Sequence, residues 1–238
     1  MIREHFEVAE SALTLLAHKE HIPYGKDAVF QARSSIEAAI KKDPYFATSF
    51  EPLVMDSDER VIKRMCSAAL KAGVGPMAAV AGTVAWEAVD AMVAQGASMA
   101  VADNGGDIAL VCDRAVTIGI HTGGPLAGIG FSIPPQDKVL GICSSSAEVG
   151  PSISLGRSRI CTVISEDVSL ADACATALGN LVQSDDETHL KECLDRILSI
   201  ADIKGAMINA GGRLAMRGDL PRLVKVEEQD DLITRRLL

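Results

Sequence analysis

A stretch of small residues in the C-terminal half carries an aspartate and a threonine one helical turn apart. Within residues 169–178, Asp172 and Thr176 are four positions apart, so a helix would place both on one face. A carboxylate and a hydroxyl in that arrangement can bind Mg²⁺, a hard cation that prefers oxygen ligands and often bridges to phosphates. The alternative is local: Asp172 interacts with the helix dipole, and Thr176 bonds back to a carbonyl. Spacing alone favours the local role.

Two adjacent glycines lie between two apolar runs, in the segment Asn104-Gly105-Gly106-Asp107. Such a pair lets the backbone turn sharply and present bare N–H groups, which can bind an anionic or carbonyl-rich ligand. The plainer interpretation is a type I′ hairpin turn. The segment is neither a P-loop nor a Rossmann fingerprint, since it lacks the Gly-Lys-Ser/Thr ending and the Gly-x-Gly-x-x-Gly spacing.

Three serines in a row, Ser144, Ser145 and Ser146, follow Cys143 at the end of another apolar run. A hydroxyl run after a strand can bind phosphate or other polar ligand groups. Cys143, and likewise Cys66, could act as a nucleophile or carry sulfur if its thiolate were stabilised. The plainer interpretation is a Ser-rich turn beside a buried cysteine.

The five histidines show no zinc-binding spacing such as His-Glu-x-x-His. His121 draws the most interest because it follows an apolar run and precedes Thr122-Gly123-Gly124. A loop histidine with no catalytic role is the favoured interpretation, and the sequence assigns no catalytic base.

The elements that position these groups follow from the period of the apolar residues. Helical spacing predicts helices over residues 26–42, 56–73, 76–95, 167–183 and 186–201. Asp56 and Glu59 form a capping-box-like start for the second of these helices, and Pro76 is a first-turn proline for the third. Short apolar or alternating runs predict strands over residues 5–17, 98–102, 107–112, 115–120, 128–133, 139–143 and 159–165, and a hairpin from 206–209 and 214–217. Residues 43–55 read as a loop. Gly82, inside the third helix, indicates a close approach of backbone or ligand.

Helices come first, then a run of strands, then helices and a hairpin, and this segregation predicts an α+β fold rather than a doubly wound sheet. No linker divides the chain, so we expect a single domain over residues 1–238. A mixed or antiparallel sheet should be flanked by Ala-rich helices. A ligand crevice should lie between the sheet and the helices at 76–95 and 167–183.

Composition narrows the function classes. The net charge of −9 argues against nucleic acid, because Lys41-Lys42 and Arg235-Arg236 are the only basic clusters. The six cysteines are irregularly spaced without Cys-x-x-Cys, and the N-terminus lacks an apolar signal core. No apolar run is expected to reach the ~20 residues that span a bilayer. The sequence therefore predicts a reduced, cytoplasmic protein without a membrane partner.

The order of the motifs resembles the ApbE-like (FAD:protein FMN transferase-like) superfamily. The motifs begin with an Ala-rich helix at residues 78–85 and a Gly-Gly-Asp-Ile turn after a strand at 100–108. They continue with a strand that ends in serines at 144–146, and with a strand followed by an Ala-Asp-x-x-x-Thr-Ala-Leu helix at 162–178. In the family, an Ala-Lys-Gly helix corresponds to the Ala-rich helix, and a Thr-Ser-Gly strand end corresponds to the strand that ends in serines. The likeness covers about residues 75–180 and is specific by order more than by any one motif.

The resemblance has departures. Gly82-Thr83 stands where the family has Lys-Gly, and Gly156-Arg157-Ser158-Arg159 stands where it has His-His-Ile-Ile-Asp-Pro. The endings at residues 209–212 and 218–221 look like those of a cytoplasmic branch of the superfamily, found in archaea and some bacteria.

The resemblance implies an α+β fold with an ApbE-like sheet of T-fold-like repeats, an FAD site, and Mg²⁺ at the pyrophosphate. It assigns the metal to Asp172 and Thr176. The ligand would be lined by Asn104, Gly105, Gly106 and Asp107, with Ser144, Ser145 and Ser146.

The leading hypothesis is a flavin- or nucleotide-binding protein with Mg²⁺ and an FMN- or nucleotide-transferase-like activity. A second is a sulfur carrier or sulfur-metabolism accessory protein that uses Cys143 or Cys66. A third is a non-catalytic, homo-oligomeric binding module, which an exposed Ala-rich helical face would indicate.

Overall fold

The computed structural model describes residues 1–9, 11–120, 127–146 and 156–227. An eight-stranded antiparallel sheet has the order β1-β2-β3-β4-β7-β8-β9-β10. Its strands are β1 (Ile2–Val8), β2 (Ser11–Ala17), β3 (Ala100–Asn104), β4 (Asp107–Cys112), β7 (Gln136–Ser145), β8 (Ile160–Ser165), β9 (Ile203–Ala210) and β10 (Arg213–Gly218). A three-stranded antiparallel sheet is made of β5 (Val116–Ile120), β6 (Ile129–Ile133) and β11 (Arg222–Lys225).

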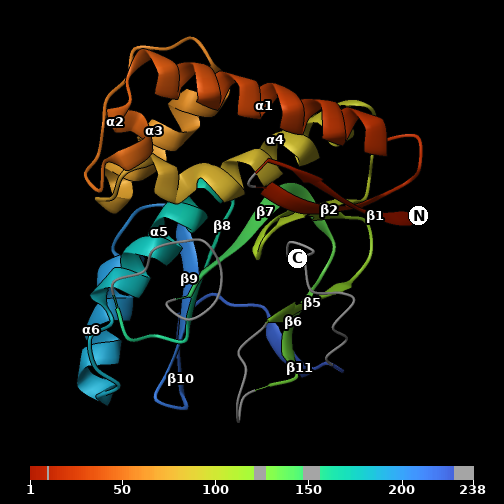
Figure 1. Cartoon of the computed structure of the whole chain (residues 1–238). Helices are drawn as coiled ribbons and strands as arrows, with labels where there is room; N and C mark the ends of the chain where they lie inside the picture. Colours follow the sequence, from red (N-terminus) through yellow and green to blue (C-terminus); the bar gives the residue numbers. More distant parts are fainter. Residues whose placement is uncertain (10, 121–126, 147–155, 228–238) are drawn as a thin grey trace.

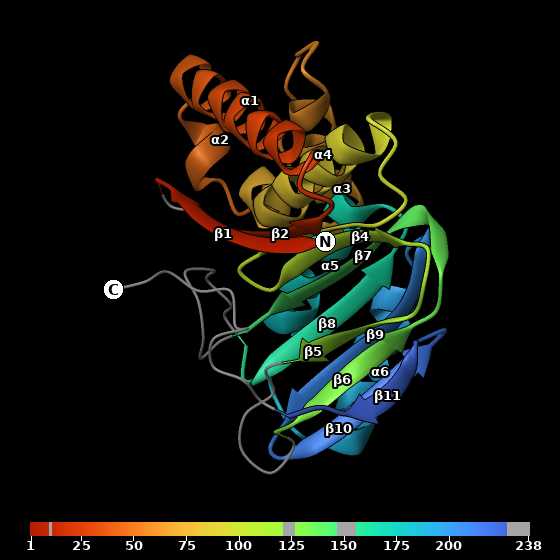
Figure 2. The same ribbon diagram turned by 90° about the vertical axis from the view of Figure 1, so that its right-hand side faces the viewer.

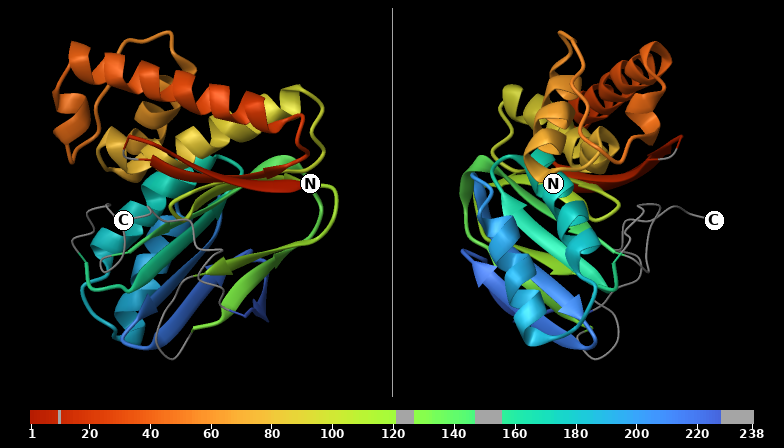
Figure 3. Two further views of the ribbon diagram at one scale, coloured as in Figure 1. Left: turned by 45° about the vertical axis from the view of Figure 1, so that its right-hand side comes forward. Right: turned by 90° about the vertical axis from the view of Figure 1, so that its left-hand side faces the viewer.

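The helices lie together on one face of the eight-stranded sheet, and the small sheet covers the other (Figures 1 and 3). They are α1 (Ile22–Lys42), α2 (Tyr45–Thr48), α3 (Arg60–Ala72), the 3₁₀ turn η1 (Pro76–Ala79), α4 (Val80–Ala94), α5 (Val168–Leu181) and α6 (Glu187–Leu198). Helix α4 lies over β3 and β4, α5 over β7 and β8, and α6 over β9 and β10, while α1 packs on the outside of α4. The element order and the antiparallel pairing confirm the α+β prediction.

Strand alternation divides the core between the two faces. On the helix face, Ala102, Ala109, Cys143 and Val163 join the apolar sides of the helices. On the opposite face, residues such as Leu110 pack with side chains of the small sheet, including Phe131. Figure 2 shows β5, β6 and β11 in front of the large sheet. The many alanines let the helices approach the sheet closely.

Helix α4 is held in place by ionic contacts from α3. Glu87 of α4 is buried, with 8% of its surface exposed, and both Arg60 and Arg64 donate to its carboxylate. Arg64 also bonds Asp90 at 2.9 Å and lies 3.6 Å over the ring of Trp86. A buried carboxylate needs such partners because its desolvation is costly. The network fixes α4, and with it the start of that helix.

The run Pro76–Ala94 is apolar and long enough to cross a membrane by length and composition alone, which the sequence had not suggested. Half of it is buried within the fold, where it contacts α1, α5 and the sheet. That environment is typical of a core helix. Ala85 and Ala88 are buried, Ala81 and Ala91 are partly buried and Ala94 is exposed, so α4 presents no continuous exposed Ala-rich face.

Several sequence expectations are corrected. Residues 5–17 form two paired strands instead of one, because Ala9 turns the chain with a φ of 48° and no glycine marks the turn. The capping box at Asp56 is wrong, since α3 begins at Arg60 after Glu59, which makes no side-chain capping bond. Residues 45–48 of the expected loop are helical, and β11 was missed. Gly73 ends α3 with a φ of 73°, as predicted.

Candidate functional site

Asp172 caps the start of a helix to which it does not belong. Its Oδ2 accepts a hydrogen bond from the backbone N–H of Gly82 at 2.7 Å, and the N–H of Ala81 also points to this carboxylate. Both amides lie in the first turn of α4, where N–H groups lack partners within the helix. A carboxylate there is favoured by the helix dipole. The local role that the sequence suggested is therefore replaced by a tertiary cap.

Gly82 makes this contact sterically possible. A Cβ at this position would lie 2.8 Å from Asp172 Cβ, 3.0 Å from the carbonyl oxygen of Val168 and 3.2 Å from Cys143 Sγ. The predicted close approach at Gly82 is thus between α4, α5 and β7. The sequence analysis expected a crevice between the sheet and these two helices; at Gly82 the helices instead contact each other and Cys143 of β7.

Asp107, at the start of β4, brings a second carboxyl to the same place. It is buried, its Oδ1 accepts from the backbone N–H of Ser144 at 3.2 Å, and it interacts electrostatically with Asp172. Burial, followed by the repulsion from Asp172, raises the pKa of Asp107 well above its usual range. Burial also raises the pKa of Asp172 to about 7, against the opposing effect of the amides of Gly82 and Ala81. The two carboxyls form a buried pair that resists full ionisation.

The turn between β3 and β4 has the form that the sequence predicted. Gly105 and Gly106 have φ values of 67° and 101°, as the positive φ angles of a type I′ turn require. A Cβ on either glycine would meet no atom within 4 Å, so this turn faces open space. Asn104 Nδ2 donates to the carbonyl oxygen of Ala81 at 3.1 Å, which ties the turn to the start of α4.

The three serines at the end of β7 have different environments. Ser144 Oγ lies 2.9 Å from Thr162 Oγ1, and Ser146 Oγ donates to the carbonyl oxygen of Arg159 at 2.7 Å. Ser145 points to the helix face, two residues beyond Cys143, and is 2% exposed. Among the residues that the structure describes, its hydroxyl has no hydrogen-bond partner. Of the three, Ser145 has the side chain with unused bonding capacity.

Thr176 lies one turn beyond Asp172 on α5 and is half-buried. Among the residues that the structure describes, no cluster of three or more His, Cys, Asp or Glu side chains is arranged to hold a metal ion. The oxygen donors of Asp172, Asp107 and Thr176 nevertheless suit Mg²⁺ in kind. A divalent cation would also relieve the repulsion between the two buried carboxyls.

Neither cysteine singled out from the sequence lies in an environment that stabilises a thiolate. Cys143 is fully buried, and its Sγ lies 3.6 Å from the carbonyl oxygen of Val168. Burial and the nearby Asp107 and Asp172 raise its pKa well above the usual range. Cys66 is half-buried, and burial raises its pKa too. The structure therefore gives no support to a sulfur carrier.

Sequence reasoning missed three buried hydroxyl groups. Thr83 Oγ1 bonds Ser169 Oγ at 2.7 Å between α4 and α5, and Ser158 is 1% exposed beside the thiol of Cys161. Only the unusual glycine at position 82 hinted at the helix contact. His121, which the sequence analysis noted, lies outside the described residues.

A family model described as "AbpE bacteria" matches residues 2–216. The chain belongs to this family. A UPF0280 protein of Methanocella arvoryzae is 46% identical over 232 residues, which cover 97% of this chain and 94% of the relative. One of Methanothrix thermoacetophila is 43% identical over 239 residues, covering 99% and 100%. These archaeal relatives confirm the predicted branch of the superfamily.

Solved structures extend the likeness to the fold. The apo form of the Pseudomonas stutzeri flavinyl transferase ApbE superposes with a TM-score of 0.56 at 11% identity, over 91% of this chain and 94% of that one. The ApbE protein of Thermotoga maritima gives 0.56 at 12% identity, over 99% of both chains. This member of the AbpE family therefore has the ApbE-like fold that its motif order predicted.

Proposed function

We propose that this protein binds a flavin nucleotide, such as FAD, together with Mg²⁺, where α4, α5, the β3–β4 turn and the end of β7 meet. One observation carries the proposal: hydrogen bonds join Asn104 to Ala81, Gly82 to Asp172, and Ser144 to Asp107. Segments far apart in the sequence are thereby assembled at one place. The flavin transferases that share the fold support the ligand class.

The polar groups suit an anionic nucleotide. The Gly105-Gly106 turn faces open space, with the N–H of Gly106 donating to Asp103 Oδ1 at 2.9 Å, and the buried Ser145 hydroxyl can still donate or accept a bond. A buried hydroxyl that finds no partner is costly, so the Ser145 hydroxyl is expected to bond to a ligand or a water. These groups would bind the pyrophosphate or other polar parts of the nucleotide.

Asp172 and Thr176 would hold the cation, with Asp107 as the neighbouring second carboxylate. When bound there, Mg²⁺ would supply positive charge that offsets the negative charge of the carboxylates and of an anionic ligand. The amides of Gly82 and Ala81 fix the orientation of Asp172 beforehand. In this proposal the chain supplies a rigid carboxylate rather than a flexible one.

The reaction to test is transfer of the FMN part of FAD to a protein hydroxyl. The hydroxyl oxygen forms a bond to the FMN phosphorus, the bond from that phosphorus to the bridging pyrophosphate oxygen breaks, and AMP leaves as the hydroxyl proton is released. AMP release in the presence of an acceptor protein would thus report transfer. The cytoplasmic location expected from the sequence stays part of the proposal, and the six free cysteines fit a reducing compartment.

Calorimetric titration with FAD, with Mg²⁺ or with a chelator, tests binding. We expect FAD affinity that depends on Mg²⁺ and falls at least about tenfold in Asp172→Asn, as the loss of one charged contact would give. Asp58→Asn is the matched control, because that aspartate is fully exposed on the surface. Binding should be unchanged in this variant.

The outcomes separate the parts of the proposal. Binding with AMP release supports a transferase, and binding without it leaves a flavin-nucleotide-binding protein. Failure of FAD to bind under any of these conditions would overturn the proposed function.

A further inference from the structure

The chain between α1 and α3 exposes three large apolar side chains within ten residues. Tyr45, Phe50 and Val54 are 73%, 69% and 88% exposed. In Figure 2 this part of the chain stands out from the helices at the top of the molecule. Single exposed apolar side chains are ordinary, but several close together mark interaction surfaces. Residues 43–59, which we call the 43–59 segment, are therefore a candidate interaction surface.

The fold holds the 43–59 segment in place, although most of it is neither helix nor strand. Phe46 is fully buried, and Met55 packs against the core. Ser49 lies so close to Gly75 that a Cβ on this glycine would overlap the Ser49 carbonyl oxygen. Val54 is the immediate neighbour of Met55, so its outward position is set by the packing of that residue. A surface fixed in advance loses little conformational freedom when a partner binds.

The 43–59 segment is also acidic. It contains no lysine or arginine and five acidic residues, Asp43, Glu51, Asp56, Asp58 and Glu59. Asp58 Oδ1 lies 3.7 Å from Lys63 Nζ, and Lys42 Nζ donates to the carbonyl oxygen of Asp56 at 3.1 Å. Within the described part of the chain, the exposed carboxylates of Glu51 and Asp56 form no ion pair. The exposed apolar side chains therefore stand among uncompensated negative charges.

This combination of charge and apolar surface selects the kind of partner. Nucleic acid and anionic lipid headgroups carry negative charge and would be repelled. A second copy of the chain would place the same acids opposite one another across a two-fold axis. A polypeptide with lysine or arginine beside an apolar side chain matches both features. Its cations face the carboxylates, and its long basic side chains can also pack along apolar and aromatic surface.

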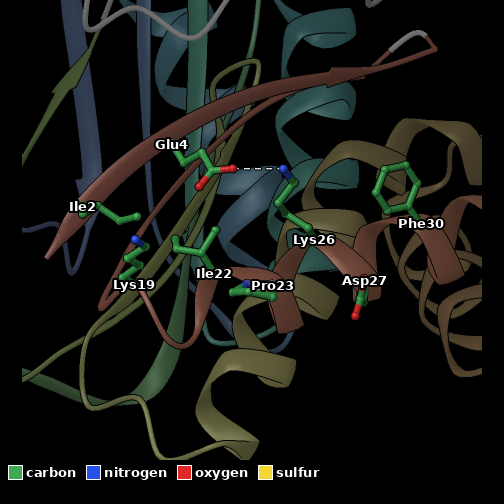
Figure 4. A pocket seen from close by; sticks show the side chains of 8 residues that line it. All are labelled: Ile2, Glu4, Lys19, Ile22, Pro23, Lys26, Asp27 and Phe30. Carbon is green, nitrogen blue, oxygen red and sulfur yellow. Dashed lines mark hydrogen bonds and ion pairs between the residues drawn. The ribbon is translucent and has the colours of Figure 1, made fainter.

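Phe30 of α1 is also 49% exposed, but its surroundings are not acidic. It lines a hollow of about 360 Å³ between β1 and the start of α1 (Figure 4). The charged residues of this hollow are two acids and two bases, Glu4, Asp27, Lys19 and Lys26. Lys26 Nζ donates to Glu4 Oε1 at 2.9 Å. Phe30 is therefore a matched control, an exposed aromatic ring among balanced charges.

We propose that the 43–59 segment is the docking surface for a polypeptide partner that presents an aromatic or aliphatic side chain flanked by lysine or arginine. The apolar side chain would cover Phe50 and Val54, and the basic residues would pair with Glu51 and Asp56. The proposal goes beyond the binding of a flavin nucleotide and does not depend on it. In a transferase, a partner docked here would be the acceptor protein.

Selection from a phage-displayed library of random short peptides, on the immobilised full chain, tests this surface. We expect the enriched peptides to combine lysine or arginine with an aromatic or aliphatic residue. A synthetic copy of the most enriched peptide is then the probe for calorimetric titration in the absence of FAD. Its affinity should fall as the salt concentration rises, because exposed charge pairs are screened.

The apolar part of the surface is tested by Phe50→Ser and Val54→Ser. Each should weaken binding of the probe peptide about tenfold or more, as the truncation of a central contact gives. Phe50→Leu keeps an apolar side chain and should bind more tightly than Phe50→Ser. Phe30→Ser is the control and should leave the affinity unchanged. Because these side chains are exposed, thermal unfolding of the variants should match that of the unaltered chain.

The charged part is tested by the double variant E51K/D56K. It should weaken binding of the probe peptide about tenfold or more and reduce the dependence on salt. Glu192→Lys, at an exposed position on α6, is the matched control and should have no effect.

Three outcomes of the selection would each overturn the proposal. They are no peptide bound above the blank surface, enriched peptides without lysine or arginine, and binding that neither Phe50→Ser nor E51K/D56K weakens. Self-association in sedimentation equilibrium that Phe50→Ser abolishes would assign the 43–59 segment to a second copy and would overturn it as well. None of these results bears on FAD binding, so this proposal and the proposed function can fail separately.

Discussion

The carboxylate of Asp172 accepts the backbone N–H of Gly82 at 2.7 Å, across ninety positions of sequence. This one bond joins α5 to the first turn of α4 and sets the position of the only carboxyl that the motif order had assigned to a metal. Two properties of the region can be examined through this contact: the need for a glycine at 82, and the raised pKa of the carboxyl, which burial causes against the opposing effect of the Gly82 amide. Each can be measured without any ligand.

Replacing Asp172 by alanine should destabilise the protein, whereas asparagine should be tolerated. Alanine leaves the first-turn amides of α4 without an acceptor in a buried place, which costs about 1–3 kcal/mol. Asparagine keeps an acceptor oxygen and removes the buried charge, so its free energy of unfolding at pH 8 should equal or exceed that of the unaltered chain. Urea denaturation of both variants measures this. An alanine variant as stable as the parent would contradict the capping role.

Gly82→Ala should be destabilising by about 1–3 kcal/mol, although alanine is the better helix former, because the new methyl group meets Asp172 Cβ at 2.8 Å. Gly25→Ala in α1 is the matched control. Its methyl group would meet only the flexible ends of Leu15 and Met92, at 3.1 Å. Thermal unfolding should therefore rank the glycine at 82 as the less replaceable of the two. The reverse order would be evidence against the close contact.

The buried carboxyl pair should make the metal-free protein less stable as the pH rises. The folded-state pKa of Asp172 is about 7, above its value of 3.8 in an unfolded chain, so the folded state holds the proton more tightly. The stability that this proton provides is complete below pH 4 and is lost as the pH rises through 7. The difference in free energy of unfolding between the parent and the double variant D107N/D172N, followed over this range in chelator, isolates the effect. A difference that does not change with pH would refute it.

The two glycines of the β3–β4 turn should differ in what they tolerate. Gly105 has a φ of 67°, which asparagine adopts readily, so Gly105→Asn should change the free energy of unfolding by less than about 0.5 kcal/mol. Gly106 has a φ of 101°, where a β-branched side chain is strained, and Gly106→Val should cost about 1–3 kcal/mol. Chemical denaturation compares them. Equal effects would mean that the turn adjusts its backbone.

Cys143 should be inert in the folded protein. A thiol reagent applied at pH 8 should modify Cys143 only at the rate of unfolding, because burial and two carboxyls hold its pKa high. Mass spectrometry of the digested protein locates the modified site. Rapid labelling of Cys143 in the native state would show that this region opens.

Local signals predicted much of the fold, and long-range pairing explains what they missed. The boundaries of β4 and the end of α3 follow from apolar runs and from Gly73. Strand β11 has only four residues, and its partner β6 lies far away in the sequence, so neither length nor period marks it. The hairpin of β1 and β2 turns at Ala9, a residue without a turn preference.

In the candidate site, too, features set by the local sequence were predictable and features set by long-range packing were not. The Gly105-Gly106 turn was predictable because its chemistry is local, and Asp172 because of its spacing to Thr176. The contacts of this turn and of Asp172 with the start of α4 were not predictable, since they depend on how α4 and α5 pack. The raised pKa of Asp172 is likewise caused by the surrounding protein and cannot be derived from the residue itself.

Strands β5 and β6 leave the large sheet after β4, and the chain returns to it as β7 beside β4. Topologically, this excursion is an insertion into what would otherwise be a simple hairpin. Its length can change over evolutionary time without shifting the register of β4 against β7 or moving Asp107. The small sheet on one face of the large sheet can therefore vary independently of Asp107 and Asp172 on the helix face.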